Sequence, residues 1–276
     1  MLKAEEAILI CPRNDEESLM ILKLAEAVNM PTIISRQPHG ARLEDEEELL
    51  SRIMDVNSEI RDIVIVEIPG PATERMLEHQ GFTVHIIDHH RYDNLDRMKQ
   101  ESSLEQFREL FHIDKGRLEA LGFDDLLVRG VGAIDRGFLW ELEAEGMNAE
   151  EKICAIRFYK ELSSELGGKS QEDIYEAKRV WENRRMENNI LILESTRGDL
   201  SIRNLLSFEM AEAYPVNPPQ TVIVQGKRRI YVQESDKAKK LHETFGGYTF
   251  GRDACWGMLV SEERPVPTLH EVLSLL

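Results

Sequence analysis

Short apolar runs alternate with amphipathic stretches between residues 7 and 88, and this alternation constrains the fold more than any other feature of the sequence. Four runs have the length and composition of β-strands, at 7–11, 32–35, 63–67 and 84–88. A stretch with helical apolar periodicity follows each of the first three. Strands that alternate with helices predict an α/β fold with a parallel sheet and helices on both of its faces. Reactive groups are then expected beyond the carboxyl ends of the strands.

The pattern changes after this first region. Residues 103–185 indicate helices without obvious strands, and further strand candidates follow at 190–193, 221–224, 229–232 and 256–260. Gln225–Arg228 suits a hairpin turn between the second and third of these. We therefore predict a first domain over residues 1–165, a helical connector over 166–188, and a smaller mixed α/β domain over 189–276.

Charge and composition exclude several functional classes. The 276 residues include 34 basic and 51 acidic side chains, which gives a net charge of −17. This balance disfavours long duplex nucleic acid and anionic membranes as partners, because no basic stripe is available to follow a phosphate backbone. The N-terminus lacks a signal-peptide pattern and no apolar run is long enough for a membrane span, so we expect a cytoplasmic protein. The three cysteines have no CxxC spacing, which favours reduced thiols.

Polar residues that end apolar strands mark the candidate site. Asp88, His89 and His90 directly follow the strand at 84–88, and carboxylate and imidazole are ligands of divalent transition metals. Glu67 ends the preceding strand, and the first strand is followed by further acidic residues. The parallel sheet would bring these groups to one edge, so the sequence predicts an acidic metal-binding pocket there.

These residues resemble the motifs of the DHH phosphoesterase superfamily, over essentially the whole chain. This superfamily includes RecJ-type exonucleases, nanoRNases, cyclic dinucleotide phosphodiesterases and manganese-dependent inorganic pyrophosphatases. Its first motif, His-x-x-x-Asp-x-Asp, is matched by Cys11, Asp15 and Glu17. Cysteine thus stands where the family has histidine, and glutamate where it has the second aspartate.

The later motifs of the family follow in the same order. Glu67 stands where a second strand ends in a metal-bridging aspartate, and Asp88-His89-His90 matches the DHH motif itself. Asp135, within Gly132–Phe138, is similar to the family's metal-binding aspartate on a glycine-rich helix.

The resemblance implies a two-metal hydrolysis at phosphorus with Mn²⁺. Cys11, Asp15 and Glu67 would hold one ion, and a second set would hold the other, namely Glu17, Glu67, His89 and Asp135. His90 would face the substrate phosphate, and Asp88 would orient a histidine ring. The soft sulfur of Cys11 would suit Zn²⁺ or Fe²⁺ better than Mn²⁺.

The C-terminal region is similar to the associated DHHA1 domain, which binds substrate through a glycine-rich loop. Gly246 and Gly247 remain from the run of glycines, while Phe250 stands where a histidine is expected. Arg228 or Arg229 falls near the arginine with which the family binds phosphate. The resemblance therefore implies substrate contacts by Arg228, Arg229, Gly246 and Gly247.

Several of these residues also have simpler interpretations. The position of Cys11 at the end of an apolar strand favours packing as a small apolar side chain over ligation. Without the resemblance, Asp15 would be explained as a helix cap. Asp135 has Arg129 and Arg136 nearby in the sequence as ion-pair partners. A homodimer is left open by the sequence.

Two functions therefore compete. The preferred one is a metal-dependent phosphoesterase that hydrolyses a phosphodiester or phosphoanhydride in a small nucleotide or short oligonucleotide. The alternative is a catalytically degenerate protein of the same fold that binds a nucleotide or a protein partner as a sensor or scaffold. Three departures from the family pattern favour it: Cys11 in place of histidine, Glu67 in place of aspartate, and the interrupted glycine loop.

Overall fold

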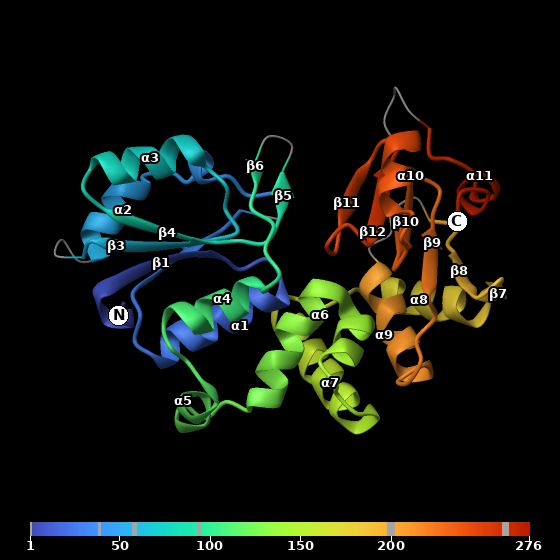
Figure 1. The fold of residues 1–276 in the computed structure, drawn as a ribbon, viewed down its shortest axis with the longest axis horizontal. Helices are drawn as coiled ribbons and strands as arrows, with labels where there is room; N and C mark the ends of the chain where they lie inside the picture. The colour runs from blue at the N-terminus through green and yellow to red at the C-terminus, as the bar shows by residue number, and fades with distance from the viewer. Residues whose placement is uncertain (1, 38–39, 57–59, 93–94, 198–201, 261–264) are drawn as a thin grey trace. The chain divides into compact units, whose positions relative to one another are not determined.

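The computed structural model describes residues 2–37, 40–56, 60–92, 95–197, 202–260 and 265–276. The chain packs into two compact units (Figure 1). The first unit is formed by Met1–Asp135 and Arg157–Gly167, and the second by Arg136–Ile156 and Gly168–Leu276. The predicted domain boundaries differ from this division, since residues 136–156 pack with the second unit. The domain boundaries given by the sequence therefore stay a prediction.

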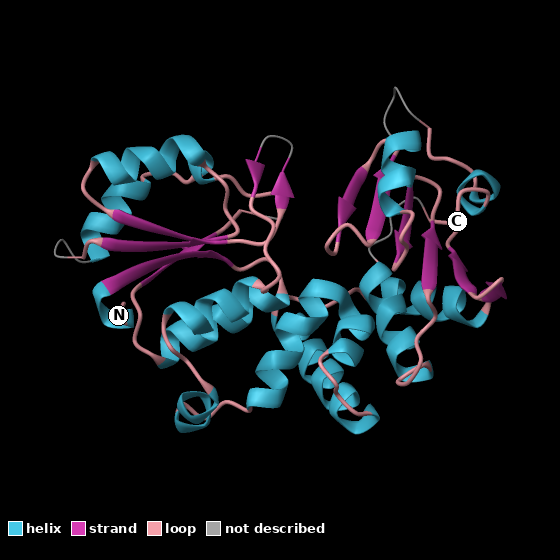
Figure 2. Ribbon diagram, viewed as in Figure 1, coloured by secondary structure: helices cyan, strands magenta, loops and turns pink. Residues whose placement is uncertain are grey.

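The first unit alternates strands and helices up to residue 87 and is mainly helical afterwards (Figure 2). Its elements are η1 (Ala4–Glu6), β1 (Ala7–Pro12), α1 (Glu16–Ala27), β2 (Thr32–Ser35), η2 (Leu43–Asp45), α2 (Leu49–Val56), β3 (Asp62–Val66), α3 (Pro71–His79), β4 (Thr83–Ile87), β5 (Arg91–Tyr92), β6 (Leu95–Asp96), α4 (Ser103–Leu110) and α5 (Lys115–Ala120). It also includes parts of α6 (Asp125–Ala144) and α7 (Ala149–Glu165).

The sheet of the first unit has the order β2-β1-β3-β4, and every neighbouring pair is parallel. Helices α2 and α3 lie on one face of it, and α1 and α4 lie on the other (Figure 1). This confirms the predicted parallel sheet with helices on both faces. All four strands end at the same edge, which is where the candidate site residues follow.

The apolar runs of the sequence form the core of this unit. All six residues of β1 are buried, as are the last four of β3, which is the pattern of strands covered on both sides. One core cluster joins the sheet to α2 and α3 and includes Ile8, Ile10, Ile33, Leu49, Ile53, Ile63, Ile65 and Leu77.

The longest helix, α6, is interrupted at Gly137 and Phe138, which have non-helical backbone angles. Asp135 therefore lies near the end of the first segment of α6, and the division between the two units falls directly after it. No helix among the described residues is long and apolar enough to cross a membrane.

The second unit contains a mixed sheet with the order β11-β12-β10-β9-β8-β7. Its remaining elements are α8 (Gln171–Glu182), β7 (Arg185–Glu187), β8 (Ile190–Glu194), α9 (Arg203–Ala213), β9 (Thr221–Gln225), β10 (Arg229–Gln233), α10 (Ala238–Phe245), β11 (Tyr248–Phe250), β12 (Cys255–Leu259) and α11 (Leu269–Leu273). Among the described strands of this sheet, β8 and β9 pair in parallel and the other neighbours are antiparallel. β9 and β10 form the predicted hairpin. Trp256 is fully buried in the core that this sheet forms with α10 and α11.

Candidate metal centre

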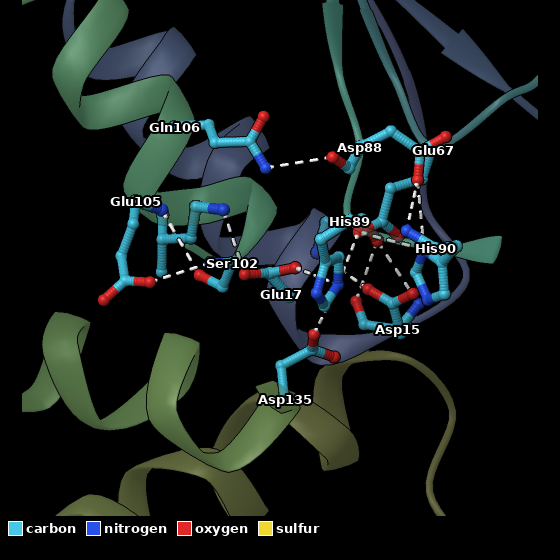
Figure 3. Close-up of polar contacts among 12 residues, drawn as sticks. Asp15, Glu17, Glu67, Asp88, His89, His90, Ser102, Glu105, Gln106 and Asp135 are labelled. Carbon is cyan, nitrogen blue, oxygen red and sulfur yellow. Dashed lines mark hydrogen bonds and ion pairs between the residues drawn. The ribbon is translucent and has the colours of Figure 1, made fainter. Parts of the chain in front are cut away.

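The polar groups of the site come from the segments that follow the carboxyl ends of three strands and from one residue of helix α6 (Figure 3). Asp15 and Glu17 lie at the start of α1, directly after β1, and Glu67 follows β3. His89 follows β4, and Asp135 comes from α6. Because β1, β3 and β4 are parallel neighbours, their ends place these residues together although they are far apart in the sequence.

Four ligand atoms of this group converge on one point. His89 Nε2 lies 3.0 Å from Asp135 Oδ2, 3.3 Å from Glu67 Oε1 and 3.8 Å from Glu17 Oε2. All four atoms lie within 4.8 Å of one another. Each of the four is shielded from solvent, and none makes a hydrogen bond of normal geometry with another described residue. Three carboxylate oxygens that crowd around one imidazole nitrogen concentrate negative charge in a buried position, and a divalent cation shared among them fits this arrangement.

Mutual repulsion and burial perturb the carboxyl groups strongly. Burial, followed by repulsion from Asp135 and Glu67, raises the pKa of Glu17 well above its usual value. Burial and then the same two carboxylates raise the pKa of Asp15 to about 7. Burial alone would lower the pKa of His89, but its contacts with Asp135 and Glu67 outweigh this and raise it to about 12. The centre thus has an excess of negative charge, which a divalent cation would neutralise.

The second oxygen of Glu17 is fixed by the backbone of α4. Glu17 Oε1 accepts a hydrogen bond of 2.9 Å from the N–H of Leu104, in the first turn of that helix. A carboxylate is favoured there because the first N–H groups of a helix have no partner within it. This contact leaves Glu17 Oε2 directed toward His89. Sequence reasoning did not find Leu104, since a backbone donor carries no side-chain signal.

Asp88 lies outside the convergent group and holds His90 instead. Its Oδ1 accepts a 3.0 Å hydrogen bond from the N–H of His90 and lies 3.2 Å from His90 Nδ1. Its Oδ2 accepts a 3.0 Å hydrogen bond from Tyr92 Oη and lies 3.7 Å from Arg97 Nη1. The backbone carbonyl of Asp88 accepts from Gln106. Tyr92, Arg97 and Gln106 were not predicted from the sequence.

This arrangement gives His90 a defined orientation. Its Nδ1 faces Asp88, and the side chain is 47% exposed. Nε2 is therefore the ring nitrogen that is available to another molecule. His90 Nδ1 also lies 3.9 Å from Glu67 Oε1, which places the ring at the rim of the centre.

Cys11 and Asp15 are held by the first turn of α1. Cys11 is completely buried, and its Sγ donates to the carbonyl oxygens of Pro12, at 3.3 Å, and Ser18, at 3.8 Å. Asp15 is the N-cap of α1, and its Oδ1 accepts a 2.7 Å hydrogen bond from the N–H of Ser18. Among the described residues, the groups of ligand atoms that lie together include neither Cys11 nor Asp15.

The predicted substrate-binding residues lie in the second unit, around its sheet. Arg228 is exposed in the turn between β9 and β10, and Arg229 begins β10. Gly246 and Gly247 connect α10 to β11. A Cβ atom on Gly247 would lie 2.3 Å from the carbonyl oxygen of Gly257, so the absence of a side chain there serves the packing of the loop. Their contact with a substrate stays a prediction.

The sequence matches no protein-family model and no curated protein. Solved structures do resemble the chain. A DHH domain described as a member of the s1p family of ribosomal proteins has a TM-score of 0.51 and 14% identity, over 98% of this chain and 85% of that one. Exonuclease RecJ bound to manganese has a TM-score of 0.40 and 14% identity, over 93% of this chain and 86% of that one. A pGpG-specific phosphodiesterase, PggH from Vibrio cholerae, has a TM-score of 0.38 and 11% identity, over 93% of each chain.

The first of these similarities concerns nearly the whole chain and shows its fold. The chain has the fold of a DHH domain, as the motifs predicted. At this identity the similarity shows the fold alone, so the activity has to be argued from the site.

Proposed function

We propose that this chain, which has a DHH-type fold, is a metal-dependent phosphoesterase acting on a phosphodiester or phosphoanhydride of a small nucleotide or short oligonucleotide. The observation that carries the proposal is the convergence of four buried atoms, from Glu17, Glu67, His89 and Asp135, that make no hydrogen bond of normal geometry within the described part of the chain. Three carboxylate oxygens and one imidazole nitrogen suit Mn²⁺, Fe²⁺ and Zn²⁺.

A divalent cation held there would supply Lewis acidity toward a phosphoryl oxygen and lower the pKa of a bound water. The side chains of the centre would fix its position. His90 would donate from Nε2 to an oxygen of the substrate phosphate, because its Nδ1 is engaged by Asp88. Asp88, held in turn by Tyr92 and Gln106, would keep that ring in place.

The substrate class follows from charge. A net charge of −17 opposes binding of long polyanions, since most phosphates of a long strand would meet a negative surface. A substrate with few phosphates loses less binding free energy to this repulsion. Its affinity would depend on the metal and on His90. We propose that Arg228, Arg229, Gly246 and Gly247 of the second unit contact the remainder of the substrate.

The proposal is tested by assaying the purified full chain with Mn²⁺ against pyrophosphate, linear dinucleotides and short 5′-phosphorylated oligonucleotides. We expect Mn²⁺-dependent hydrolysis of at least one of these substrates. Asp135→Asn should reduce it by more than the about 10–100-fold that the loss of an outer-shell partner costs. His79→Asn is the matched control, because His79 is exposed and its ring is hydrogen-bonded to the backbone of its own helix, at Arg75.

The alternative, a catalytically degenerate protein that binds a nucleotide or protein partner, is favoured by one observation. Cys11 and Asp15 contact the start of α1 and do not join the convergent group. On this alternative the substrates above would bind with a measurable Kd, and none would be hydrolysed in the presence of Mn²⁺.

A further inference from the structure

The sequence predicts two sets of metal ligands that share Glu67, and the structure assembles only one of them among the described residues. The assembled set joins Glu17, Glu67, His89 and Asp135. The other set would need Cys11 and Asp15 to direct ligand atoms toward Glu67. The contacts that Cys11 and Asp15 make therefore bear on how many cations the centre can bind.

Cys11 is engaged as a hydrogen-bond donor. Its thiol points to the carbonyl oxygens of Pro12 and Ser18, which accept only if sulfur retains its proton. A metal ligand must be a thiolate, and forming one here would place an unpaired charge against two carbonyl dipoles in a completely buried position. The sulfur therefore stabilises the junction between β1 and α1 and is not available to a cation.

Asp15 is engaged at the same turn. Its Oδ1 accepts from the N–H of Ser18, while Ser18 Oγ receives the N–H of Asp15, so the two residues form a capping box. Ser18 thus contacts both Cys11 and Asp15, and the first turn of α1 engages the thiol of Cys11 and one of the two carboxylate oxygens of Asp15.

A second group of neighbouring ligand atoms does not provide another independent position. It consists of Glu67, His89 and His90, and so shares two of its three members with the assembled set. Since His90 Nδ1 also lies 3.2 Å from Asp88, this group extends the rim of the same centre.

We infer that the centre takes a single divalent cation, held by Glu17, Glu67, His89 and Asp135, and that Cys11 and Asp15 serve the start of α1. The inference rests on the proposed function, because it concerns the metal of the same site. It differs from the two-ion arrangement that the family resemblance implies.

Metal content tests it directly. The metal-stripped full chain is titrated with Mn²⁺ by calorimetry, and bound Mn²⁺ is counted after desalting. We expect one equivalent per chain and an electron paramagnetic resonance spectrum with the hyperfine pattern of an isolated Mn²⁺ ion. Two equivalents with an exchange-coupled spectrum would overturn the inference and leave the proposed function standing. No bound Mn²⁺ would contradict both.

Variants separate the two ligand sets. Asp15→Asn retains a capping side chain and should still bind one equivalent, and Cys11→Ala should bind one equivalent with a Kd within about twofold of the wild type. Asp135→Asn should weaken binding by more than about 10-fold. Circular dichroism of each variant verifies that it is folded. Loss of one of two equivalents in Cys11→Ala would show that the thiol is a ligand.

Co²⁺ gives a second measurement that does not depend on variant stability. Thiolate-bound Co²⁺ absorbs intensely in the near ultraviolet through sulfur-to-metal charge transfer, whereas oxygen- and nitrogen-bound Co²⁺ does not. We expect the Co²⁺-loaded wild type to lack this band and to have the same spectrum as Co²⁺-loaded Cys11→Ala. A band in the wild type that Cys11→Ala removes would overturn the inference.

Discussion

His89 Nε2 lies 3.0 Å from Asp135 Oδ2, which joins the end of β4 to the first segment of α6. This contact completes the convergent group, since the other two carboxylates come from the neighbouring strand ends. The group therefore forms only when α6 is packed against the carboxyl edge of the sheet. Cation binding and the packing of α6 should consequently be thermodynamically linked.

The first prediction concerns this linkage. Mn²⁺ at 100 times its Kd should raise the free energy of unfolding of the wild type by about 2.7 kcal/mol. Asp135→Asn should show at most about half of this gain at the same Mn²⁺ concentration, since its Kd is expected to be more than about 10-fold weaker. Its metal-free form should be at least as stable as the metal-free wild type, because one of several close negative charges is gone. Urea unfolding with and without Mn²⁺ measures both effects. Asp236→Asn, at an exposed position, is the control. If Mn²⁺ stabilised Asp135→Asn as much as it stabilises the wild type, the linkage would be refuted.

The strand ends of the site were predictable because the strands of this parallel sheet are short apolar runs with a clear sequence signal. Apolar runs that stop at a polar residue identified Glu67 and Asp88 directly. Their closeness followed from the parallel order of the strands, which the βαβ pattern implies. Asp135 has no such signal and was found only through the family resemblance.

The direction of individual side chains was not predictable. Cys11 occupies the position that the resemblance gives to a ligand, yet its sulfur points to carbonyl groups at the start of α1. Whether a residue at a strand end faces the site or the following helix depends on local backbone geometry that composition does not encode. The contact of Leu104 N–H with Glu17 depends likewise on how α4 packs.

The second prediction concerns Tyr92. Its hydroxyl donates to Asp88 Oδ2, and the Asp88 side chain has no solvent exposure, so Tyr92→Phe leaves a buried carboxylate oxygen with one donor fewer. We expect the free energy of unfolding to fall by about 1–3 kcal/mol. With the proposed activity, Tyr92→Phe should lower kcat by a larger factor than it raises KM, because Asp88 would fix the His90 ring less firmly.

The control for Tyr92 is Tyr175→Phe, since Tyr175 is 72% exposed. This variant should match the wild type in urea unfolding and in kinetics. If Tyr92→Phe also matched the wild type in both measurements, the hydroxyl contact with Asp88 would have no role in holding His90.

The third prediction concerns pH and a glutamate of the second unit. Burial, with added repulsion from Glu141, raises the pKa of Glu234 to about 7, compared with 4.5 for an unperturbed glutamate. A carboxyl that holds its proton more tightly when folded destabilises the protein as pH rises from about 4.5 to about 7. Glu234→Gln should therefore be more stable than the wild type at pH 8, by roughly 1 kcal/mol given its partial exposure, and not at pH 4.

Urea unfolding at pH 4 and pH 8 tests this sign. Exposed Glu243→Gln is the matched control in the same unit and should change stability by a similar small amount at both values. Equal effects of Glu234→Gln at pH 4 and pH 8 would mean that burial of Glu234 imposes no pH-dependent cost.

The last prediction separates the structural role of Gly247 from its predicted substrate contact. Gly247 has φ +83°, and a Cβ there would meet the carbonyl oxygen of Gly257 at 2.3 Å, which backbone atoms cannot easily relieve. Gly81 has φ +91° with open space around it, so Gly81→Ala measures the backbone cost alone, about 1–2 kcal/mol. Gly247→Ala should lower the free energy of unfolding by more than Gly81→Ala does, by roughly 3 kcal/mol or above, because the steric clash adds to the backbone strain. Urea unfolding of both variants in the absence of substrate measures the difference. Equal losses would indicate that the loop shifts freely, and Gly247 would then be explained better by a substrate contact than by packing.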